Sequence, residues 1–201
     1  MASDIDFYFD FSSPYGYFAA TRIDALAAKY GRKVKWHPVL LGVVFKKSGA
    51  APLTMVPLKG EYSRHDFVRS ARFHRIPFNM PTTFPIASQN AARVVLWLQN
   101  QGKEEQAVAF AKAVYHAFFV NGQDISDLTK LQTVMAAQGL DVAAATEAIN
   151  EPLIKEQLKS EVEQAIELGV FGSPYLIVDG EPFWGFDRFE QLEALLKNGS
   201  I

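Results

Sequence analysis

Residues 8–17 (YFDFSSPYGY) hold the side chains whose types and spacing could do chemistry. A short apolar run leads into Ser13-Pro14, where serine suits a helix N-cap and proline the first helical position. The simplest interpretation of Ser13 is a cap that contributes about 1 kcal/mol to the helix. A helix N-terminus also favours an anion, so the Ser13 hydroxyl could donate a hydrogen bond to a thiolate that a cofactor brings. Ser12 is a weaker candidate, because it precedes the cap.

The other polar candidates lie far along the chain from Ser13. A site for a carboxylate substrate needs a cation, and Lys46 and Lys59 in a loop-rich segment are candidates for it. The alternative is that they are solvated, as loop lysines usually are. Asp187 is most simply the cap of the last helix, with Glu190 as its capping-box partner, but its carboxylate could also hold a ligand's ammonium group. Trp184 is expected in the core. The 4 histidines have no metal-like spacing, so no metal site is expected.

The composition excludes several classes of function. The chain has 201 residues, a net charge of −2 and no cysteine, which rules out a disulfide, a thiolate metal site or dithiol chemistry of its own. No basic run indicates a nucleic-acid or anionic membrane partner, and no apolar run approaches the roughly 20 residues of a membrane span. The N-terminal residues lack the features of a signal peptide, so a cytoplasmic location is expected.

The hydrophobic pattern predicts the elements that position Ser13. Residues 5–9 alternate as a buried strand, helical spacing follows up to Gly31, and residues 34–38 form a second strand. This β-α-β order implies a parallel pair with a right-handed crossover.

The rest of the chain changes character twice. Residues 42–83 are expected to be loops with one helix around 61–75, and residues 86–168 are helical. Strands at 175–178 and 181–184 flank the hairpin turn Asp179-Gly180, and a helix follows. The sum is an α/β protein with a thioredoxin-like core, β-α-β … β-β-α, in residues 1–42 and 169–201, and an all-helical insertion in residues 43–168.

In such a core, Ser173-Pro174 would contain a cis-proline that faces the N-terminus of the first helix. The backbone N–H and C=O of Ser173 would then pair with an extended, peptide-like ligand, as an added strand does. The alternative is an ordinary proline at the start of a strand, where its missing N–H costs nothing.

Five segments carry a resemblance to a known family. They are, in order, FYFDFSSPYGYFA, LLGVVFKKSG, VPLKGEY, AFFVNGQDISD and GVFGSPYLIVDGEPFWGFDR. Together they resemble the 2-hydroxychromene-2-carboxylate isomerases, which belong with the kappa-class glutathione transferases among the DsbA-like proteins. The resemblance implies an interrupted thioredoxin fold, glutathione as the cofactor, a small aromatic carboxylate as the substrate, and a homodimer.

The resemblance also implies roles for individual residues. Ser13 matches the catalytic serine that steadies the glutathione thiolate. The backbone of Ser173 matches the residue that pairs with the cysteinyl group of glutathione. The remaining matches are Trp184, Gly185, Phe186 and Asp187 for the γ-glutamyl end, and Lys46 and Lys59 for the substrate, with Lys46 placed for its carboxylate.

Several positions depart from the family pattern. Residues 48–50 read SGA where many relatives have T-G-N, and Ala87 replaces a frequent asparagine. Ser173 is usually valine, and Phe186 is often small or polar. Of these, Ala50, Ala87 and Phe186 remove polar groups or fill space near the expected site.

The leading hypothesis is a glutathione-dependent isomerase that converts 2-hydroxychromene-2-carboxylate, or a similar intermediate, to trans-o-hydroxybenzylidenepyruvate. One alternative is a kappa-class-like glutathione transferase or peroxidase that acts on other electrophiles. Another is a DsbA-like module that binds peptides without catalysis.

Overall fold

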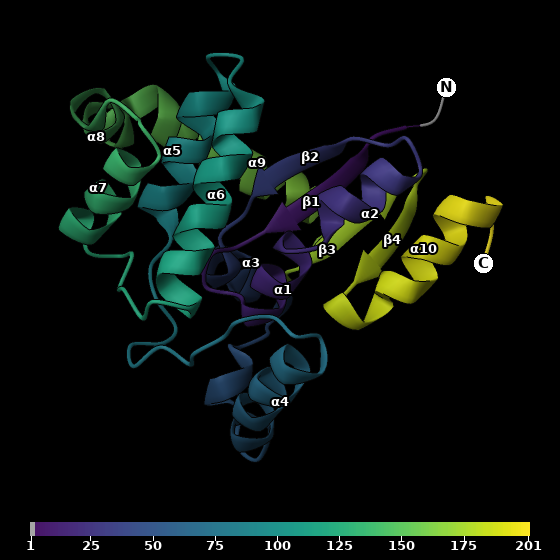
Figure 1. The fold of residues 1–201 in the computed structure, drawn as a ribbon. Coiled ribbons are helices and arrows are strands. Elements are labelled where there is room, and N and C mark those ends of the chain that lie inside the picture. Colours follow the sequence, from purple (N-terminus) through teal and green to yellow (C-terminus); the bar gives the residue numbers. More distant parts are fainter. Residues whose placement is uncertain (1–2) are drawn as a thin grey trace.

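A four-stranded mixed sheet forms the centre of the protein (Figure 1), in a computed structural model that describes residues 3–201. The first two residues of the predicted segment 1–42 therefore lie outside the described residues. The strand order is β2-β1-β3-β4. Strand β1 pairs in parallel with β2 and antiparallel with β3, so the predicted β-α-β and β-β units are confirmed. The strands are β1 (Ile5–Phe9), β2 (Val34–Pro38), β3 (Tyr175–Val178) and β4 (Glu181–Trp184).

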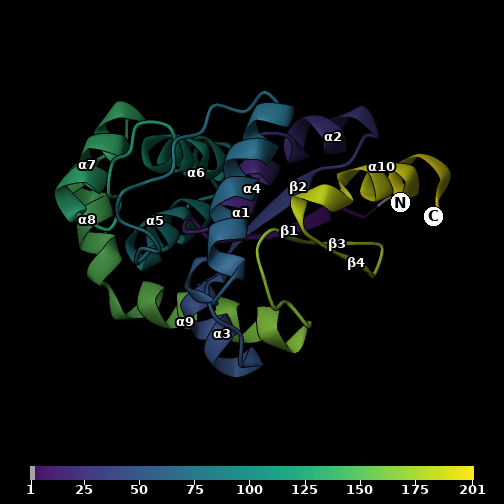
Figure 2. The same ribbon diagram turned by 90° about the horizontal axis from the view of Figure 1, so that it is seen from below.

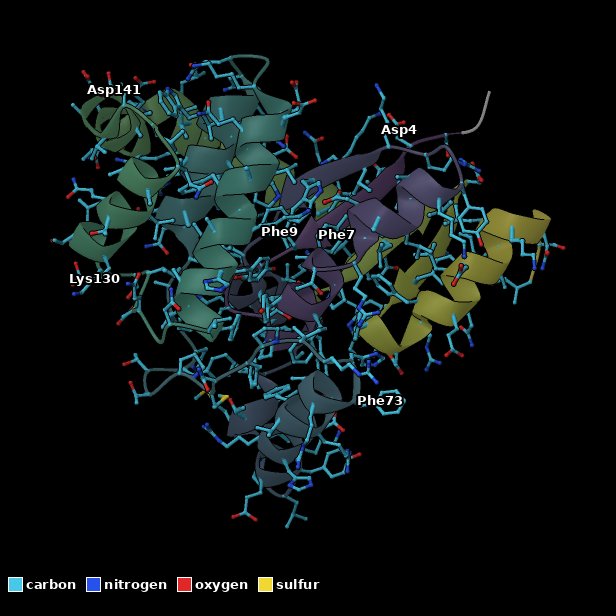
Figure 3. The ribbon with its side chains drawn as sticks, in the orientation of Figure 1. Asp4, Phe7, Phe9, Phe73, Lys130 and Asp141 are labelled. Atoms are coloured by element: carbon cyan, nitrogen blue, oxygen red, sulfur yellow. The ribbon has the colours of Figure 1, made fainter. Side chains whose placement is uncertain are left out.

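Helices cover both faces of the sheet, as Figure 2 shows from below. On one face, Phe7 and Phe9 are fully buried in the larger core cluster (Figure 3), which residues of α1, α2 and α10 complete. On the other face, Tyr8 packs in a second cluster with residues of α3 and α9. The period of two along β1 decides which side chain enters which cluster. These helices are α1 (Pro14–Ala20), α2 (Ile23–Lys29), α3 (Leu41–Ser48), α9 (Pro152–Glu167) and α10 (Phe189–Asn198).

The middle of the chain forms a helical block beside the sheet, as the sequence predicts. Its further helices are α5 (Gln89–Gln99), α6 (Glu104–Phe119), α7 (Leu128–Ala137) and α8 (Val142–Asn150). Asp141 caps α8 by accepting a hydrogen bond from Ala144 N at 3.1 Å. None of the helices within residues 3–201 is long and apolar enough to cross a membrane.

Residues 42–83 contain more helix than the sequence indicates. The helix expected around 61–75 is present as α4 (Lys59–Phe73), preceded by a short 3-10 helix (Leu53–Met55), but α3 was not expected. Only Val44 of α3 is buried. Its start is fixed from outside, because Leu41 N donates to Asp10 Oδ2 at 2.6 Å. The predicted boundary between residues 42 and 43 falls inside α3, and the division into two domains stays a prediction.

The expected cap of the last helix is wrong. Asp187 lies in a 3-10 helix (Phe186–Arg188), and α10 begins at Phe189 with no side-chain cap. Gly185 has a φ of 107°, and a Cβ at this residue would collide with Asp187 Oδ1. The Asp187 carboxylate therefore lies back over Gly185 and does not reach the first N–H groups of α10.

A charged cluster joins β1, β2 and α9 away from Ser13. His37 Nε2 lies 2.9 Å from Asp6 Oδ1, and its Nδ1 lies 3.8 Å from Glu161 Oε2. The imidazole stacks on the Tyr8 ring, with 4.8 Å between ring centroids. Burial alone would lower the pKa of His37, but Glu161 and Asp6 outweigh it and raise that pKa.

This cluster predicts a pH-dependent contribution to stability. Because the folded-state pKa of His37 is raised, its stabilisation is fully present below an unfolded value of about 6.5 and is lost as the pH rises through the folded value. Urea denaturation at pH 5.5 and pH 8.5 should show that His37→Gln loses up to about 1 kcal/mol more at the lower pH. The control is His116→Gln, an exposed position on α6. An equal effect of His37→Gln at both pH values would contradict the assignment.

Candidate functional site

Ser13 begins the first helix, as the sequence predicts. Its φ and ψ are −102° and 114°, which is extended backbone, and its Oγ accepts a hydrogen bond from Gly16 N at 3.0 Å. Pro14 is the first helical residue. The Ser13 side chain is therefore held by the helix that it caps, with its hydroxyl at the end of β1.

The structure brings Ser13 into contact with Ser173. Ser13 Oγ lies 2.7 Å from the carbonyl oxygen of Ser173, across 160 residues of sequence. Ser13 is 5% exposed and Ser173 is 8% exposed. The Ser173–Pro174 peptide bond is cis, which agrees with the sequence-based expectation. The two serines predicted from separate motifs thus form one site.

Beneath them lies a buried carboxylate that the sequence analysis did not single out. Asp10 is 3% exposed. Its Oδ1 accepts hydrogen bonds from Ser12 N at 2.8 Å and Ser88 Oγ at 2.7 Å, and its Oδ2 accepts one from Leu41 N at 2.6 Å. Burial raises the pKa of Asp10, and these three hydrogen bonds lower it in part. One carboxylate therefore joins the turn before α1 to the starts of α3 and α5.

The backbone of Asp10 extends the same network. Its N–H donates to Ser173 Oγ at 3.1 Å, and its carbonyl oxygen accepts hydrogen bonds from Ser13 N and from the Tyr115 hydroxyl, both at 2.9 Å. Tyr115, on α6, is fully buried, and burial raises the pKa of its phenol well above the ordinary value. The site is therefore anchored to the helical block as well as to the sheet. The signal in the sequence was Asp10 itself, an acidic residue between Phe9 and Phe11 in an otherwise apolar run.

Gly16 provides the space that these groups need. A Cβ at Gly16 would lie 2.8 Å from Ser173 Oγ, 2.9 Å from the Tyr115 hydroxyl and 3.1 Å from Ser13 Cβ. Both of the first two distances are too short for real contacts. Only glycine at this helical position lets α1 approach the loop that contains Ser173.

The residues proposed for the γ-glutamyl end have different environments. Gly185 N donates to Pro174 O at 3.1 Å, which ties this segment to the loop of Ser173. The side chain of Asp187 is 73% exposed and lies 3.6 Å from Arg188. Phe186 is only 6% exposed, and its ring packs against those of Phe18, His74 and Phe189. Gly185 and Asp187 can therefore meet a ligand, whereas the Phe186 side chain belongs to the core.

Trp184 is not in the core, contrary to expectation. It is 52% exposed, because on the edge strand β4 it is Phe183 that points inward. The Trp184 ring packs against exposed Phe171, with centroids 4.8 Å apart. A Cβ at Gly172 would collide with Trp184 Nε1, so the indole lies directly over the residue before Ser173.

The two lysines stay apart from the serines. Lys46, in the last turn of α3, and Lys59, at the start of α4, are both exposed. Within residues 3–201, neither has an ion pair or hydrogen bond with Ser13 or Ser173. The α4 helix is nevertheless tied to α1, because the Tyr15 hydroxyl donates to Asp66. The lysine assignments remain predictions.

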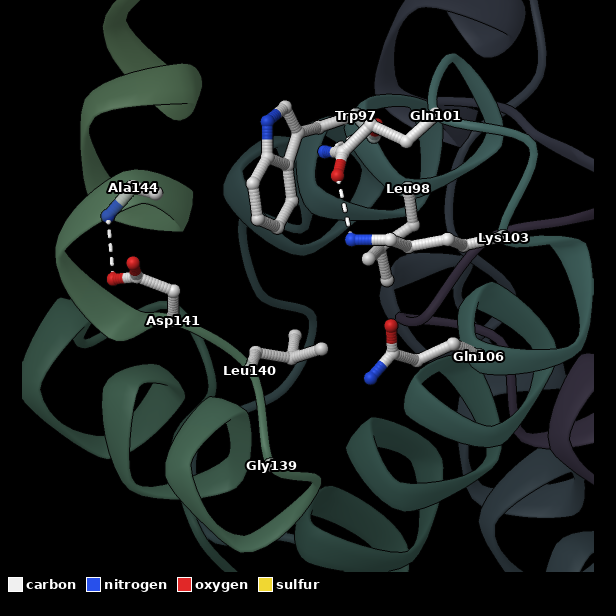
Figure 4. Close-up of a pocket in the computed structure, with 9 residues that line it drawn as sticks. All are labelled: Trp97, Leu98, Gln101, Lys103, Gln106, Gly139, Leu140, Asp141 and Ala144. Atoms are coloured by element: carbon white, nitrogen blue, oxygen red, sulfur yellow. Dashed lines mark hydrogen bonds between the residues drawn. The ribbon is translucent and has the colours of Figure 1, made fainter.

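Two hollows lie outside the serine pair. A cavity of about 290 Å³ between α5, α6 and the start of α8 has Trp97, Lys103 and Asp141 in its wall (Figure 4). A cleft of about 150 Å³ lies between Lys47 on α3 and Phe171. No cluster of possible metal ligands occurs among the described residues.

Comparisons with known proteins show the family to which this chain belongs. A model of the DsbA-like thioredoxin domain family matches residues 4–197. The chain is 32% identical over 199 residues to a 2-hydroxychromene-2-carboxylate isomerase of Sphingobium xenophagum, which covers 98% of this chain and 99% of that protein. It is 29% identical over 205 residues to glutathione S-transferase kappa 1 of Caenorhabditis elegans, covering 96% and 90% of the two chains.

A solved structure of 2-hydroxychromene-2-carboxylate isomerase matches with a TM-score of 0.86 and 30% identity, over 96% of this chain and 94% of that one. The fold and the serine pair define a thioredoxin-like protein without a thiol of its own. The chain belongs to the DsbA-like thioredoxin domain family, in the group of the 2-hydroxychromene-2-carboxylate isomerases.

The crowding at Gly16 gives a first prediction about the candidate site. Glycine to alanine inside a helix normally stabilises by up to about 1 kcal/mol. Gly16→Ala should instead destabilise by about 1–3 kcal/mol in urea denaturation, because the new methyl group overpacks the serine pair. The matched control is Gly42→Ala in α3, where a Cβ meets nothing within 4 Å. Equal stability of the two variants would refute the crowding.

The buried carboxylate gives a second prediction. Asp10→Asn replaces one acceptor oxygen with an amide that cannot accept from Ser12 N or Leu41 N. A buried donor left unpaired costs about 1–3 kcal/mol, and urea denaturation should show a loss of this size. The control is Asp127→Asn, since asparagine caps a helix as well as aspartate does and Asp127 caps α7. A loss below about 0.5 kcal/mol would show that Asp10 does not organise the site.

Proposed function

We propose that this protein is a glutathione-dependent isomerase that acts on 2-hydroxychromene-2-carboxylate or a similar product of aromatic-ring degradation. The observation that carries the proposal is the contact between Ser13 and the carbonyl of Ser173 in a chain that lacks cysteine. It supports the view that the site receives a thiol and does not supply one. The full-length similarity to the named isomerase supports the substrate class.

The residues present fit glutathione on one structural ground. The N–H of Ser173 has no acceptor within the described residues, and its carbonyl faces Ser13, so both backbone groups are placed to pair with an extended peptide. Gly185 and Asp187, tied to the same loop, would hold the γ-glutamyl end. Bound glutathione would supply the thiolate that adds to the conjugated enone and leaves after rotation about the former double bond.

The chain's own residues would stabilise charge and orient the substrate. The Ser13 hydroxyl would donate a hydrogen bond to the thiolate, and hydrogen bonds to ions are about twice as strong as neutral ones. Lys46 would attract the substrate carboxylate, and Lys59 would add positive charge on the neighbouring helix. Asp10 would act as a positioning residue, because its carboxylate holds the turn that carries Ser13.

A transferase or peroxidase that acts on other electrophiles is the second candidate, favoured by the similarity to glutathione S-transferase kappa 1. Product analysis separates the two candidates, since a transferase leaves a stable conjugate and an isomerase a rearranged substrate. We also propose, on the family resemblance, a cytoplasmic homodimer. A peptide-binding module without catalysis would bind peptides at Ser173 and show no glutathione-dependent turnover.

The proposal predicts the behaviour of Ser13→Ala. Removing a hydrogen bond to a charged group should lower the glutathione-dependent isomerisation rate by about 10- to 100-fold. Calorimetric titration with glutathione and a rate assay with the chromene carboxylate would measure binding and turnover separately. The control is Ser160→Ala on α9, where the hydroxyl contacts only Gln164 among the described residues. An unchanged rate in Ser13→Ala would reject the proposed mechanism.

A further inference from the structure

The position of the Ser13 proton follows from its two partners. Gly16 N–H can only donate to the Ser13 oxygen, and the carbonyl of Ser173 can only accept. The hydroxyl proton must therefore point at Ser173 O, at a donor–acceptor distance of 2.7 Å. Without a ligand, the Ser13 hydroxyl therefore donates its proton to Ser173 O, and it has no second proton to donate to a thiolate.

The Ser173 carbonyl depends on that proton. Ser173 is 8% exposed, and Ser13 Oγ is the one donor to its carbonyl within the described residues. The Ser173 side chain is engaged elsewhere, because its Oγ accepts a hydrogen bond from Asp10 N at 3.1 Å. Turning the Ser13 hydroxyl away would leave a buried carbonyl without a partner, which is unfavourable unless a new donor arrives.

We propose that the ligand itself releases the Ser13 proton, so that the site activates a thiol only when it belongs to a peptide-like molecule. An amide N–H of the ligand, next to its thiol-bearing carbon, donates to Ser173 O and replaces Ser13 there. The Ser13 hydroxyl then turns to the thiolate while it still caps α1. This inference rests on the proposed function and adds a selection rule to it.

The selection rule separates the binding of a thiol from the stabilisation of its thiolate. A small thiol without the amide N–H can enter the site, but it leaves the Ser13 proton on the carbonyl. Its thiolate then gains nothing from Ser13. The backbone carbonyl of Ser173, and not its side chain, therefore decides which thiols are activated.

Two ligands of the wild-type protein test this rule without any risk of misfolding. One is glutathione, and the other is its depsipeptide analogue, in which an ester oxygen replaces the cysteinyl N–H. Each is titrated to saturation, and the pKa of the bound thiol is read from the ultraviolet absorbance of the thiolate across a pH series. Glutathione should show a pKa lowered by about one unit or more, which is a tenfold gain in thiolate, whereas the analogue should stay near its free value.

Two variants show whether Ser13 is the donor. In Ser13→Ala, the thiol pKa of the two bound ligands should become equal. Ser12→Ala is the matched control and should keep the difference, since Ser12 Oγ accepts from Ile86 N at 3.1 Å, apart from Ser173. Loss of the difference in Ser12→Ala would assign the donor to Ser12 and overturn the proposal.

The remaining outcomes distinguish this inference from the function on which it rests. Binding of both ligands with equally lowered thiol pKa overturns the selection rule and leaves the proposed function standing. Failure of the analogue to bind at 100-fold the Kd of glutathione also overturns it, because the rule assigns one hydrogen bond to that N–H and not the whole affinity. No saturable binding of glutathione overturns both.

Discussion

The carboxylate of Asp10 is the interaction on which the rest of the site depends. Three donors converge on it from separate parts of the chain, at the turn before α1, at the start of α3 and at Ser88 before α5. Its backbone adds contacts to Tyr115 and to the side chain of Ser173. A buried anion is costly unless it is fully hydrogen-bonded, so each of these segments must be in place for the others to be stable.

This arrangement also constrains the electrostatics of thiol chemistry. Asp10 lies in the segment that carries Ser13, and an unshared negative charge there would oppose a thiolate at the cap. Its two carboxylate oxygens accept hydrogen bonds from Ser12 N, Leu41 N and Ser88 Oγ. Under the proposed function, the side that faces glutathione would present the neutral hydroxyl of Ser13. The site could then contain a structural carboxylate and still accept a thiolate.

The sequence predicted the elements whose signals are local. The alternation of residues 5–9, the Ser-Pro cap of α1 and the Asp-Gly turn each follow from a few neighbouring residues, and the structure confirms them. It did not predict α3, because the donor–acceptor pair that fixes this helix joins Leu41 to Asp10. Trp184 and Asp187 were placed wrongly for the same reason, since an edge strand and the backbone of Gly185 decide where they point. The serine pair could be anticipated only from the predicted thioredoxin-like core and the family motifs, since its members lie 160 residues apart.

That separation decides when the site can form. On the ribosome, Ser13 leaves the exit tunnel early, while Ser173, in the loop before β3, is synthesised only after the whole helical block. Strand β1 lies between β2 and β3, and only β2 is close to it in sequence. The edge of β1 that faces β3 therefore stays unpaired until β3 is made. Pairing of strands that lie far apart in sequence is intrinsically slow, so we expect the helical block to fold before Ser13 and Ser173 meet. A chain that stops before residue 173 therefore has Ser13 but lacks the carbonyl to which its hydroxyl donates.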